Sequence, residues 1–294
     1  MNILNFGSLN IDLVYSVPHI AQPGETISST QHCVFAGGKG ANQSAALARA
    51  GAAVYHAGQV GQDGAWLVAK LRGLGVDMQW TQVTSEPTGH ALIQVAESGE
   101  NSIVLFPGAN TTLQRPHIDR AIGHFKKGDI LLLQNEINDI PYIIGQAAQR
   151  GMRIAFNPAP FHADILTYDL EQVEWLLLNE TEAAGLLSAT LMPDATLAAL
   201  AQRYPHAHLV LTLGAGGVRL CSPEATYAVP ARTVHAVDTT GAGDTFIGYF
   251  LAALTAGHDA LTALQHGVHA AALCVTKSGA MDSIPTLEEV RKIL

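Results

Sequence analysis

The chain has 294 residues, 48% of them hydrophobic, and a formal net charge of -9 that is spread along the sequence without a basic block. This length and hydrophobic content allow one large buried core, or a main core with a small appendage, and argue against disorder. The charge argues against nucleic acid or an anionic membrane surface as the main partner, so any nucleotide site would have to be local.

The cellular compartment is indicated by the cysteines and by the N-terminus. The three cysteines, Cys33, Cys221 and Cys274, are odd in number and far apart, which fits a reducing environment. No basic segment precedes the first apolar residues, and no stretch reaches the roughly 18 uncharged apolar residues that a membrane helix needs. We therefore expect a cytoplasmic protein that is neither secreted nor anchored.

The first apolar run, residues 2–6, predicts a short strand, and Asn10 and Asp12 follow it at alternate positions. A period of two places these polar side chains on one face. At the carboxyl end of a strand in an open α/β sheet, that face usually binds ligands, although the spacing equally allows two residues that cap a strand. Residues 14–34 carry short β-prone runs broken by prolines, which predicts a small strand pair outside the main sheet.

A glycine-rich stretch, residues 37–42, opens a helix that we expect to span residues 42–50. Its glycines would let a ligand lie against the backbone, and Lys39 and Asn42 offer donors for hydroxyl groups. The alternative is a glycine-rich turn with a solvated lysine. The stretch is neither a P-loop nor a dinucleotide fingerprint, because it has the spacing of neither motif.

The next segments predict a second, smaller sheet. Residues 54–60 predict a strand and residues 65–74 a helix, while residues 89–95 and 101–106 predict a β-hairpin. We expect this hairpin to complete the sheet begun near residue 14, which makes the smaller domain discontinuous. The predicted α/β domain comprises residues 1–13, 36–87 and 107–294, and the predicted small β lid comprises residues 14–35 and 88–106.

After residue 107, strands and helices alternate, which predicts a parallel sheet with helices on both faces. The expected strands span residues 130–133, 153–156, 175–178 and 208–213, and the expected helices span residues 141–150 and 180–187. Polar clusters accompany the strand ends at residues 134–136, 157–160, 179–182 and 212–217. Because the carboxyl ends of parallel strands meet at one edge, we expect ligand chemistry there.

The stretch from Val237 to Gly257 predicts a turn that leads directly into a helix, expected from residue 245. Gly241, Ala242 and Gly243 carry almost no side chain, so their N–H groups can approach an anion at the positive end of the helix. Asp244 beside them is well placed to take a proton from a hydroxyl, which suggests phosphoryl transfer to an alcohol. The alternative is that Asp244 only caps the helix. A further helix and an amphipathic tail are expected at residues 261–275 and 287–294.

Two of these stretches resemble the signatures of a known family. Asp-Thr-Thr-Gly-Ala-Gly-Asp at residues 238–244 resembles the C-terminal signature of the ribokinase-like (PfkB) sugar kinases, and Phe-Ala-Gly-Gly-Lys-Gly-Ala-Asn-Gln at residues 35–43 resembles the N-terminal one. The resemblance spans nearly the whole chain. It implies an α/β sandwich with a mostly parallel central sheet, helices on both faces and a small β-sheet lid. It also implies transfer of the γ-phosphoryl group of ATP to a primary hydroxyl.

The resemblance further implies roles for individual residues. Asp244 would be the catalytic base and would contact the substrate, and Gly241, Ala242 and Gly243 would form the anion hole. The positions that would hold the sugar hydroxyls match the ribokinase pattern in particular, which points to a pentose. These positions are Asn10, Asp12, Gly38, Lys39, Asn42 and Glu136.

The implied cofactors are ATP, Mg²⁺ and K⁺. ATP would lie across Asn179, Thr212, Gly214 and Gly217, with Glu182 near Mg²⁺ through water. The monovalent cation would be bound mainly by backbone oxygens. The matching positions are Asp238, Thr240, Cys274, Lys277, Gly279 and Ser283. Lids in this family often pair with the lid of a second subunit, so the resemblance also implies a homodimer.

The leading prediction is an ATP-dependent pentose kinase that converts D-ribose to D-ribose 5-phosphate. A nucleoside kinase of the same fold is the first alternative, although the lid segments offer few aromatic residues for a base. Deoxyribose or fructose are other possible acceptors. A non-catalytic sugar sensor would be expected to lack the base or the anion hole, and both are present. A nicotinamide dehydrogenase would need a dinucleotide fingerprint.

Overall fold

The computed structural model describes residues 1–294, which form two sheets and nine α-helices. The strands of the large sheet are β1 (Ile3–Phe6), β4 (Val54–Gly61), β5 (Asp77–Thr84), β8 (Ile130–Gln134), β9 (Arg153–Asn157), β10 (Trp175–Asn179), β11 (His208–Thr212), β12 (Val218–Cys221) and β13 (Thr226–Val229). The small sheet consists of β2 (Asn10–Val17), β3 (Gln31–Gly37), β6 (Gly89–Ala96) and β7 (Asn101–Phe106). The helices are α1 (Lys39–Arg49), α2 (Ala65–Gly73), α3 (Arg115–Gly123), α4 (Ile140–Gln149), α5 (Glu180–Leu187), α6 (Pro193–Arg203), α7 (Ala242–Thr255), α8 (Ala260–Cys274) and α9 (Leu287–Arg291).

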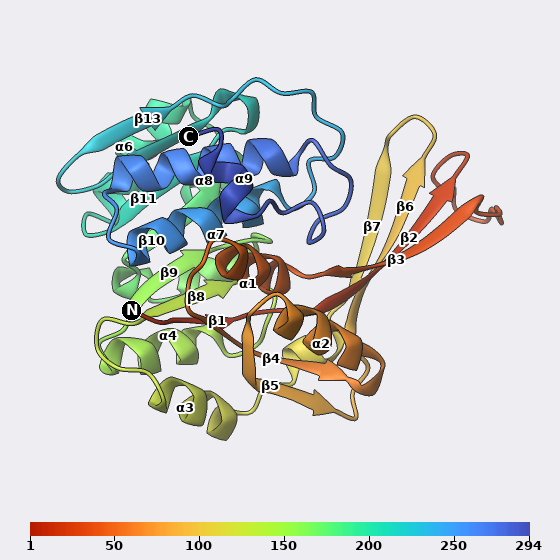
Figure 1. Ribbon diagram of the computed structural model, residues 1–294, viewed down its shortest axis with the longest axis horizontal. Coiled ribbons are helices and arrows are strands. Elements are labelled where there is room, and N and C mark those ends of the chain that lie inside the picture. Colours follow the sequence, from red (N-terminus) through yellow and green to blue (C-terminus); the bar gives the residue numbers. More distant parts are fainter.

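The large sheet has the strand order β13-β12-β11-β10-β9-β8-β1-β4-β5. All neighbours from β11 to β5 pair in parallel, and only β12 and β13 add antiparallel pairs at one end. Helices lie on both faces, and the small sheet projects from the body as a separate arm (Figure 1). The expected mostly parallel α/β sandwich with an additional small β-sheet is therefore confirmed.

Two hydrophobic cores lie on opposite faces of the large sheet. Along β8, Ile130 and Leu132 enter one core, while Leu131 and Leu133 enter the other. Helices α1, α2, α7, α8 and α9 cover the first core, and α3, α4, α5 and α6 cover the second. Because both faces are covered, the central strands are buried along their whole length and are almost continuously apolar.

The strand order reverses between β1 and β8. From β1 the chain adds β4 and β5 on one side, and from β8 it adds β9, β10 and β11 on the other. In open α/β sheets the crevice at the carboxyl ends of such a pair of strands is where ligands bind. Ser8 follows β1 and Glu136 follows β8, and their side chains are hydrogen bonded to each other at this point.

The small sheet begins earlier than predicted. Asn10 and Asp12 were expected at the end of the first strand, but β1 ends at Phe6 and both residues lie in β2, between β3 and β6. The chain leaves the large sheet at Gly7, where a Cβ atom would lie only 2.5 Å from Gly40 Cα. The small sheet therefore starts at Asn10 rather than at residue 14, and its first hairpin ends at Gly37 rather than at residue 35. The division into domains stays a prediction.

Helix starts were also predicted too late. Helix α1 begins at Lys39 and α7 at Ala242, because Gly38 (φ 90°) and Gly241 (φ 75°) serve as their N-caps in conformations that favour glycine. The elements β5, α3, α6, β12 and β13 had no counterpart among the predictions. No helix combines the length and the apolar character that crossing a membrane requires.

Candidate active site

Helices α1 and α7 pack closely and bring together two stretches that lie far apart in the sequence. At Gly248 on α7, a Cβ atom would lie 2.3 Å from the Cβ of Ala46 on α1. This contact places two α1 amides against the carboxylate of Asp244. Asn42 Nδ2 lies 3.1 Å from Asp244 Oδ2, and Gln43 Nε2 lies 2.9 Å from Asp244 Oδ1. Asp244 is buried, with 8% of its surface exposed.

The N-terminus of α7 lies beside this carboxylate, and its first N–H group, that of Ala242, donates to Thr239 O at 3.3 Å. Gly241 caps the helix without a side-chain hydrogen bond, and Asp244 lies in the first turn. The first N–H groups of a helix have no intrahelical partner and carry partial positive charge. Gly241 and Gly243 line the cavity described next, whereas Ala242 between them does not. The turn therefore has the geometry of an anion-binding site.

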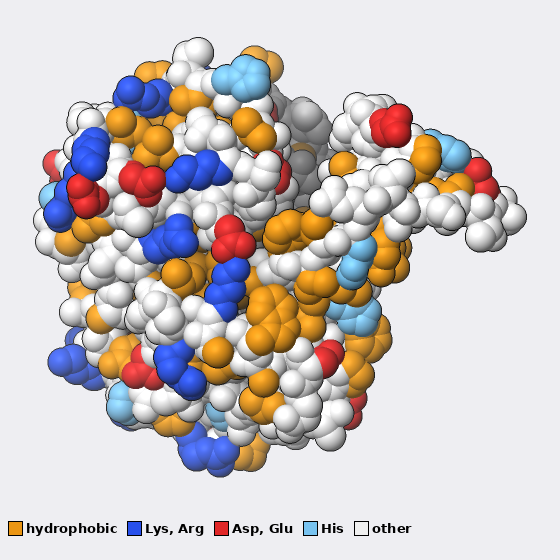
Figure 2. Space-filling view, turned by 45° about the vertical axis from the view of Figure 1, so that its right-hand side comes forward, with side chains coloured by type: hydrophobic (Ala, Val, Ile, Leu, Met, Phe, Trp, Pro, Cys, Tyr) orange, Lys and Arg blue, Asp and Glu red, His pale blue; other side chains and the backbone are white.

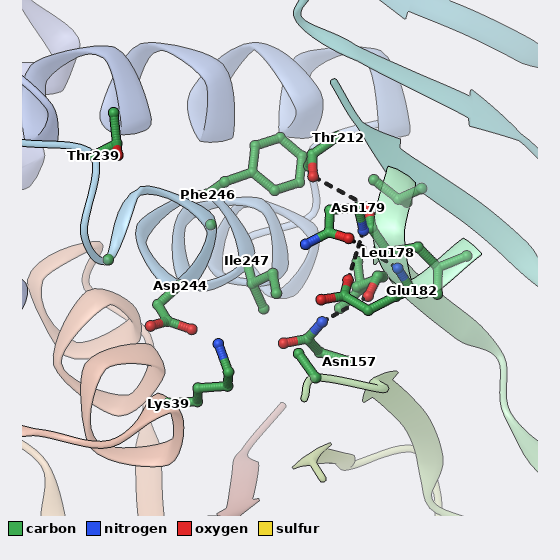
Figure 3. A pocket seen from close by; sticks show the side chains of 15 residues that line it. Lys39, Asn157, Leu178, Asn179, Glu182, Thr212, Thr239, Asp244, Phe246 and Ile247 are labelled. Atoms are coloured by element: carbon green, nitrogen blue, oxygen red, sulfur yellow. Dashed lines mark hydrogen bonds between the residues drawn. The ribbon is translucent and has the colours of Figure 1, made fainter. Parts of the chain in front are cut away.

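A cavity of about 240 Å³ opens in front of Asp244 (Figure 3). At one end, the side chains of Lys39 and Asp244 point toward each other, and at the other end lie Asn179, Glu182 and Thr212 (Figure 3). Its 15 lining residues are Lys39, Asn157, Ala159, Leu177, Leu178, Asn179, Glu182, Val210, Thr212, Thr239, Gly241, Gly243, Asp244, Phe246 and Ile247. The cavity thus joins the start of α7 to the carboxyl ends of β10 and β11.

The charges around Asp244 partly balance one another. Burial raises the pKa of Asp244, while the Lys39 ammonium and the amides of Gln43 and Asn42 act in the opposite direction. Burial alone would lower the pKa of Lys39, but Asp244, Glu136 and Glu182 together raise it. Lys39 is therefore charged at neutral pH. A carboxyl whose pKa is raised toward neutrality is suited to take up a proton during a reaction.

The carboxyl groups of Asp12 and Glu136 lie close to that of Asp244, at the base of the small sheet. Burial raises the pKa of Asp12 to about 7, and the charges of Glu136 and Asp244 add to this effect. Glu136 accepts hydrogen bonds from Ser8 Oγ and, at 3.1 Å, from the backbone N–H of Lys39. The Asp12 carboxylate packs against the backbone of Gly37, where a Cβ atom would lie only 2.1 Å from Asp12 Oδ2.

Two amides complete this polar group. Asn10 Oδ1 accepts a hydrogen bond of 2.7 Å from Asn110 Nδ2, which fixes the orientation of the Asn10 amide. Asn42 Oδ1 is buried and has no hydrogen-bond partner, although Asn42 Nδ2 is bound to Asp244. An unpaired buried oxygen is costly, so Asn42 is prepared to accept a donor from a ligand. Gly38 lies directly before Lys39 as the N-cap of α1.

At the far end of the cavity, Asn179 and Glu182 form the capping box of α5. Asn179 Oδ1 accepts from the backbone N–H of Glu182 at 3.0 Å, and Glu182 Oε2 accepts from the N–H of Asn179 at 2.7 Å. Thr212 Oγ1 donates to Leu178 O at 3.1 Å. Gly214 and Gly217 lie in the turn after β11 and do not line this cavity. At Gly217 a Cβ atom would lie 2.2 Å from Val229 O, so the turn packs tightly on β13.

The residues predicted to surround a monovalent cation lie in two adjoining loops, except Cys274, which is the last residue of α8. Asp238 joins these loops by accepting hydrogen bonds of 2.9 Å from the N–H groups of Thr240 and Gly279. Cys274 Sγ lies 3.0 Å from Ser283 Oγ. The Lys277 ammonium instead points to α9, where it binds Glu289 at 3.0 Å. No three His, Cys, Asp or Glu side chains are grouped as they would be around a metal ion.

Several residues of the site were not assigned by sequence analysis. Asn157, the last residue of β9, lines the cavity and lies within a polar cluster that was noted without assigning a role. Gln43 is the last residue of the N-terminal signature and contacts Asp244. Thr239 also lines the cavity, and it lies within the C-terminal signature. No local sequence pattern identifies Ser8 as a site residue, because its contact with Glu136 depends on the pairing of β1 with β8.

Comparison with known proteins places the chain in a family. Residues 2–287 match the model of the pfkB family of carbohydrate kinases. The chain belongs to this family. The ribokinase of Haemophilus influenzae is 37% identical to this PfkB kinase over 98% of the chain and 96% of its own length. The ribokinase of Bacillus subtilis is 36% identical over 100% of this chain and 99% of its own length.

Solved structures agree with this relationship. The ribokinase of Cryptococcus neoformans var. grubii serotype A, in complex with ADP, has a TM-score of 0.87 and 37% identity, and the match covers 100% of this chain and 99% of that one. The PfkB kinase is therefore an ATP-dependent phosphotransferase that acts on a sugar hydroxyl, as the two sequence signatures predicted.

Proposed function

We propose that this PfkB kinase transfers the γ-phosphoryl group of ATP to the primary hydroxyl of D-ribose and so forms D-ribose 5-phosphate. The observation that carries the proposal is the buried carboxylate of Asp244, which lies in the first turn of α7 and faces Lys39 (Figure 3). The curated ribokinases support the choice of sugar. Support also comes from a solved ribokinase of Arabidopsis thaliana complexed with ribose and ATP, which has a TM-score of 0.87 and 29% identity.

In this mechanism Asp244 acts as the general base. It takes the proton of the primary hydroxyl as that oxygen forms its bond to the γ-phosphorus, and the bond from phosphorus to the bridging oxygen of ADP breaks. The N–H groups at Gly241, Ala242 and Gly243 would bind the charge that develops on the transferred group. Lys39 adds a positive charge on the same side of the cavity.

Sugar recognition would use the groups at the base of the small sheet. Ionised Asp12 and Glu136 can only accept hydrogen bonds; Asp12 suits two hydroxyl donors of a sugar, whereas Glu136 offers Oε1, because its Oε2 accepts from Ser8 and Lys39. Lys39 can only donate, and the unpaired Asn42 Oδ1 can accept one more hydroxyl. With Asn10 and the backbone at Gly38, these groups would select a particular arrangement of hydroxyls.

The nucleotide would occupy the end of the cavity near Asn179 and Thr212 and extend toward the turn at Gly214 and Gly217. For Mg²⁺, Glu182 offers one carboxylate oxygen, because Oε2 is committed to the N–H of Asn179 and Oε1 is free. Mg²⁺ usually keeps several waters and needs only one or two carboxylates, so this donor fits a water-mediated site. The ion would supply positive charge to the phosphate oxygens of ATP.

A K⁺ site would lie between the loops that Asp238 joins. The two loops approach closely, since a Cβ atom at Gly241 would lie 3.1 Å from Ala280 Cα. Thr240, Gly279 and the neighbouring Cys274 and Ser283 would contribute mainly backbone oxygens. Lys277 could contribute only its backbone carbonyl, because its side chain points to Glu289. Such a cation would hold the loop before α7, and with it the anion hole.

The acceptor is tested by ADP release from ATP and Mg²⁺, with and without K⁺, against a panel of acceptors. The panel contains D-ribose, 2-deoxyribose, fructose, adenosine, uridine and pseudouridine. We expect ribose to have the highest kcat/KM. Deoxyribose belongs in the panel because a deoxyribokinase of Salmonella typhi is 30% identical over the whole chain. A nucleoside with the highest kcat/KM would support the alternative function.

We also infer that the kinase forms a cytoplasmic homodimer through the outer face of the small sheet. Val34, Leu13, Leu92 and Val104 form one cross-strand row. Val104 is 63% exposed and Val34 is 49% exposed. Side chains alternate along β2, so this row faces away from the side that carries Asp12. Hydrophobic side chains gather where the arm meets the body (Figure 2).

The dimer is tested by sedimentation of the native chain and of Val104→Glu. We expect a dimer for the native chain and a monomer for the variant, because a buried unpaired charge would destabilise the interface. The control is Val83→Glu, an exposed change on the edge strand β5 that should leave the dimer intact. A native chain that sediments as a monomer at micromolar concentration would contradict the inference.

A further inference from the structure

A continuous network of buried polar side chains extends from Asp244 and from Asn157 at the cavity wall into the interior. Its members have no more than 6% of their surface exposed. They are Gln43, Asn157, Gln134, Asn5, Ser44 and His56. An unpaired buried member of such a network is costly, and the unpaired atom among these side chains is Gln134 Oε1.

Backbone carbonyls fix the direction of the hydrogen bonds at two ends of the network. Asn157 Nδ2 donates to Leu177 O at 2.9 Å, so Asn157 Oδ1 must be the atom that accepts from Gln43. Asn5 Nδ2 donates to Gly40 O at 2.8 Å, so Asn5 Oδ1 is likewise an acceptor. A carbonyl oxygen cannot donate, and therefore neither amide can be reversed without losing its bond.

These two constraints meet at Gln43. Gln134 Nε2 donates to Asn5 Oδ1 at 3.0 Å and to Gln43 Oε1 at 2.6 Å, which makes Gln43 Oε1 an acceptor. Gln43 Nε2 must then face the other way, where it donates to Asn157 Oδ1 at 3.2 Å and to Asp244 Oδ1 at 2.9 Å. A reversed Gln43 amide would bring oxygen against oxygen at both Asp244 and Asn157.

His56 fixes the third end of the network. Its Nε2 lies 3.2 Å from Gly7 O and must donate there, so in the neutral ring Nδ1 accepts from Ser44 Oγ at 2.8 Å. Ser44 Oγ in turn accepts from Asn5 Nδ2 at 2.8 Å. Every bond between Gly7 and Asp244 therefore has one permitted direction.

We propose that Gln43 is a positioning residue for phosphoryl transfer, because its directed amide fixes the rotation of the Asp244 carboxylate relative to the acceptor hydroxyl. This inference rests on the proposed function. Gln43 is fully buried and is not among the residues that line the cavity. It contacts two residues that do line the cavity, Asp244 and Asn157, and of these Asp244 carries the reacting carboxylate.

The same hydrogen bond contributes to the charge balance of the base. The charged and titratable groups that act on Asp244 are Lys39 from α1, Asp12 from β2, Glu136 after β8 and Glu182 from α5. Burial raises the pKa of Asp244, and the Gln43 amide is one of the groups that lower it. Loss of this donor should therefore make Asp244 harder to ionise.

The test uses Gln43→Met, which keeps the length of the side chain and removes the donor. We expect kcat for ribose to fall about tenfold or more while the KM for ribose stays within about twofold. We also expect the acid limb of kcat/KM to move to higher pH. The control is Leu47→Ala on the same helix, which removes buried apolar contacts and no hydrogen bond to Asp244. The control should lower the melting temperature and leave the acid limb in place.

A second variant, Gln43→Glu, distinguishes positioning from general support of the fold. When protonated, the new carboxyl can donate to Asp244 as the amide did, whereas its ionised form would repel Asp244. Its activity relative to the native enzyme should therefore rise as the pH falls. The inference would be overturned if the relative activity of Gln43→Glu did not change with pH. It would also be overturned if Gln43→Met kept the native kcat and acid limb, or if Leu47→Ala showed the same pH shift as Gln43→Met. A native enzyme that releases no ribose-dependent ADP would instead contradict the proposed function.

Discussion

Asn42 Nδ2 lies 3.1 Å from Asp244 Oδ2, although 202 positions separate the two residues in the chain. This contact joins the two glycine-rich signatures into one site at the crossing of α1 and α7. Each signature alone is compatible with a turn before a helix. Together they place the Asp244 carboxylate, the N-terminus of α7 and the Lys39 side chain around one cavity.

Replacing the base should stop the chemical step while substrate binding is largely kept. For Asp244→Asn we expect kcat to fall about 10²–10⁴-fold, with only a modest change in the KM for ribose, because a general base acts mainly in the transition state. Asp259→Asn is a suitable control, since Asp259 also lies at a helix N-terminus but caps α8. Steady-state kinetics with ribose would check both variants. Equal turnover in Asp244→Asn and the native enzyme would remove Asp244 from the mechanism.

Ribose binding should depend on the ionisation of Asp12. Its pKa, raised to about 7 by burial and by Glu136 and Asp244, means that the carboxyl is mostly protonated below that pH. If the ionised form accepts two hydroxyls, affinity should increase up to about tenfold between about pH 6 and about pH 8. Calorimetric titration with ribose alone would measure this. Asp12→Asn should bind more weakly and without this dependence, and an equally steep pH profile in the variant would exclude Asp12 as its source.

His56 should make folding stability sensitive to acid. Burial lowers its pKa to about 4, so between about pH 6.5 and about pH 4 the unfolded chain binds a proton that the folded chain does not. The free energy of unfolding therefore loses a contribution as the pH falls through this window. From about pH 6.5 to about pH 5 the loss amounts to about 2 kcal/mol.

This loss is best measured as a difference between urea unfolding of the native chain and of His56→Asn. The difference cancels the opposing contributions of buried carboxyls such as Asp12, which become costlier to bury as the pH rises. The variant should lose about 2 kcal/mol less than the native chain over the same interval. Parallel pH profiles of the two proteins would show that His56 is not neutral in the fold.

The crossing of α1 and α7 should not tolerate a methyl group at Gly248. The Cβ of Gly248→Ala would lie 2.3 Å from Ala46 Cβ, so the helices must separate. We expect the variant to lose about 1–3 kcal/mol of stability and much of its activity, because Asn42 and Gln43 move relative to Asp244. Gly145→Ala on α4 is the matched control, since nothing lies within 4 Å of its Cβ.

The control should be neutral or gain up to about 1 kcal/mol, as alanine favours helix over glycine. Thermal unfolding and ribose kinetics of both variants would check the comparison. Similar behaviour of Gly248→Ala and Gly145→Ala would show that close helix packing does not set the geometry of the site.

Local signals predicted much of this fold and site. The apolar strands and the glycine stops depend on residues close in sequence, so β8, β9, β10 and β11 agree with their predicted ranges to within a residue or two. The glycine turn before α7 was also recognisable, because Gly241 and Gly243 are small and Asp244 directly follows them, and its anion-binding role stays a prediction.

Other features depend on contacts between distant segments. The start of β2 at Asn10 is set by its pairing with Gly37 and Gly89, which no local pattern reveals. The contact of Gln43 with Asp244 follows from the α1–α7 crossing. The strands β12 and β13 are only four residues long each and gave no periodic signal.

The central claim is tested most directly by identifying the product formed from D-ribose, ATP and Mg²⁺. Phosphorus NMR of the reaction mixture, with coupling to the sugar protons, locates the transferred group. We predict one sugar phosphate, D-ribose 5-phosphate, formed in equal amount to ADP by the native enzyme and nearly absent with Asp244→Asn. A phosphate on another hydroxyl, or ADP release without a sugar phosphate, would contradict the account.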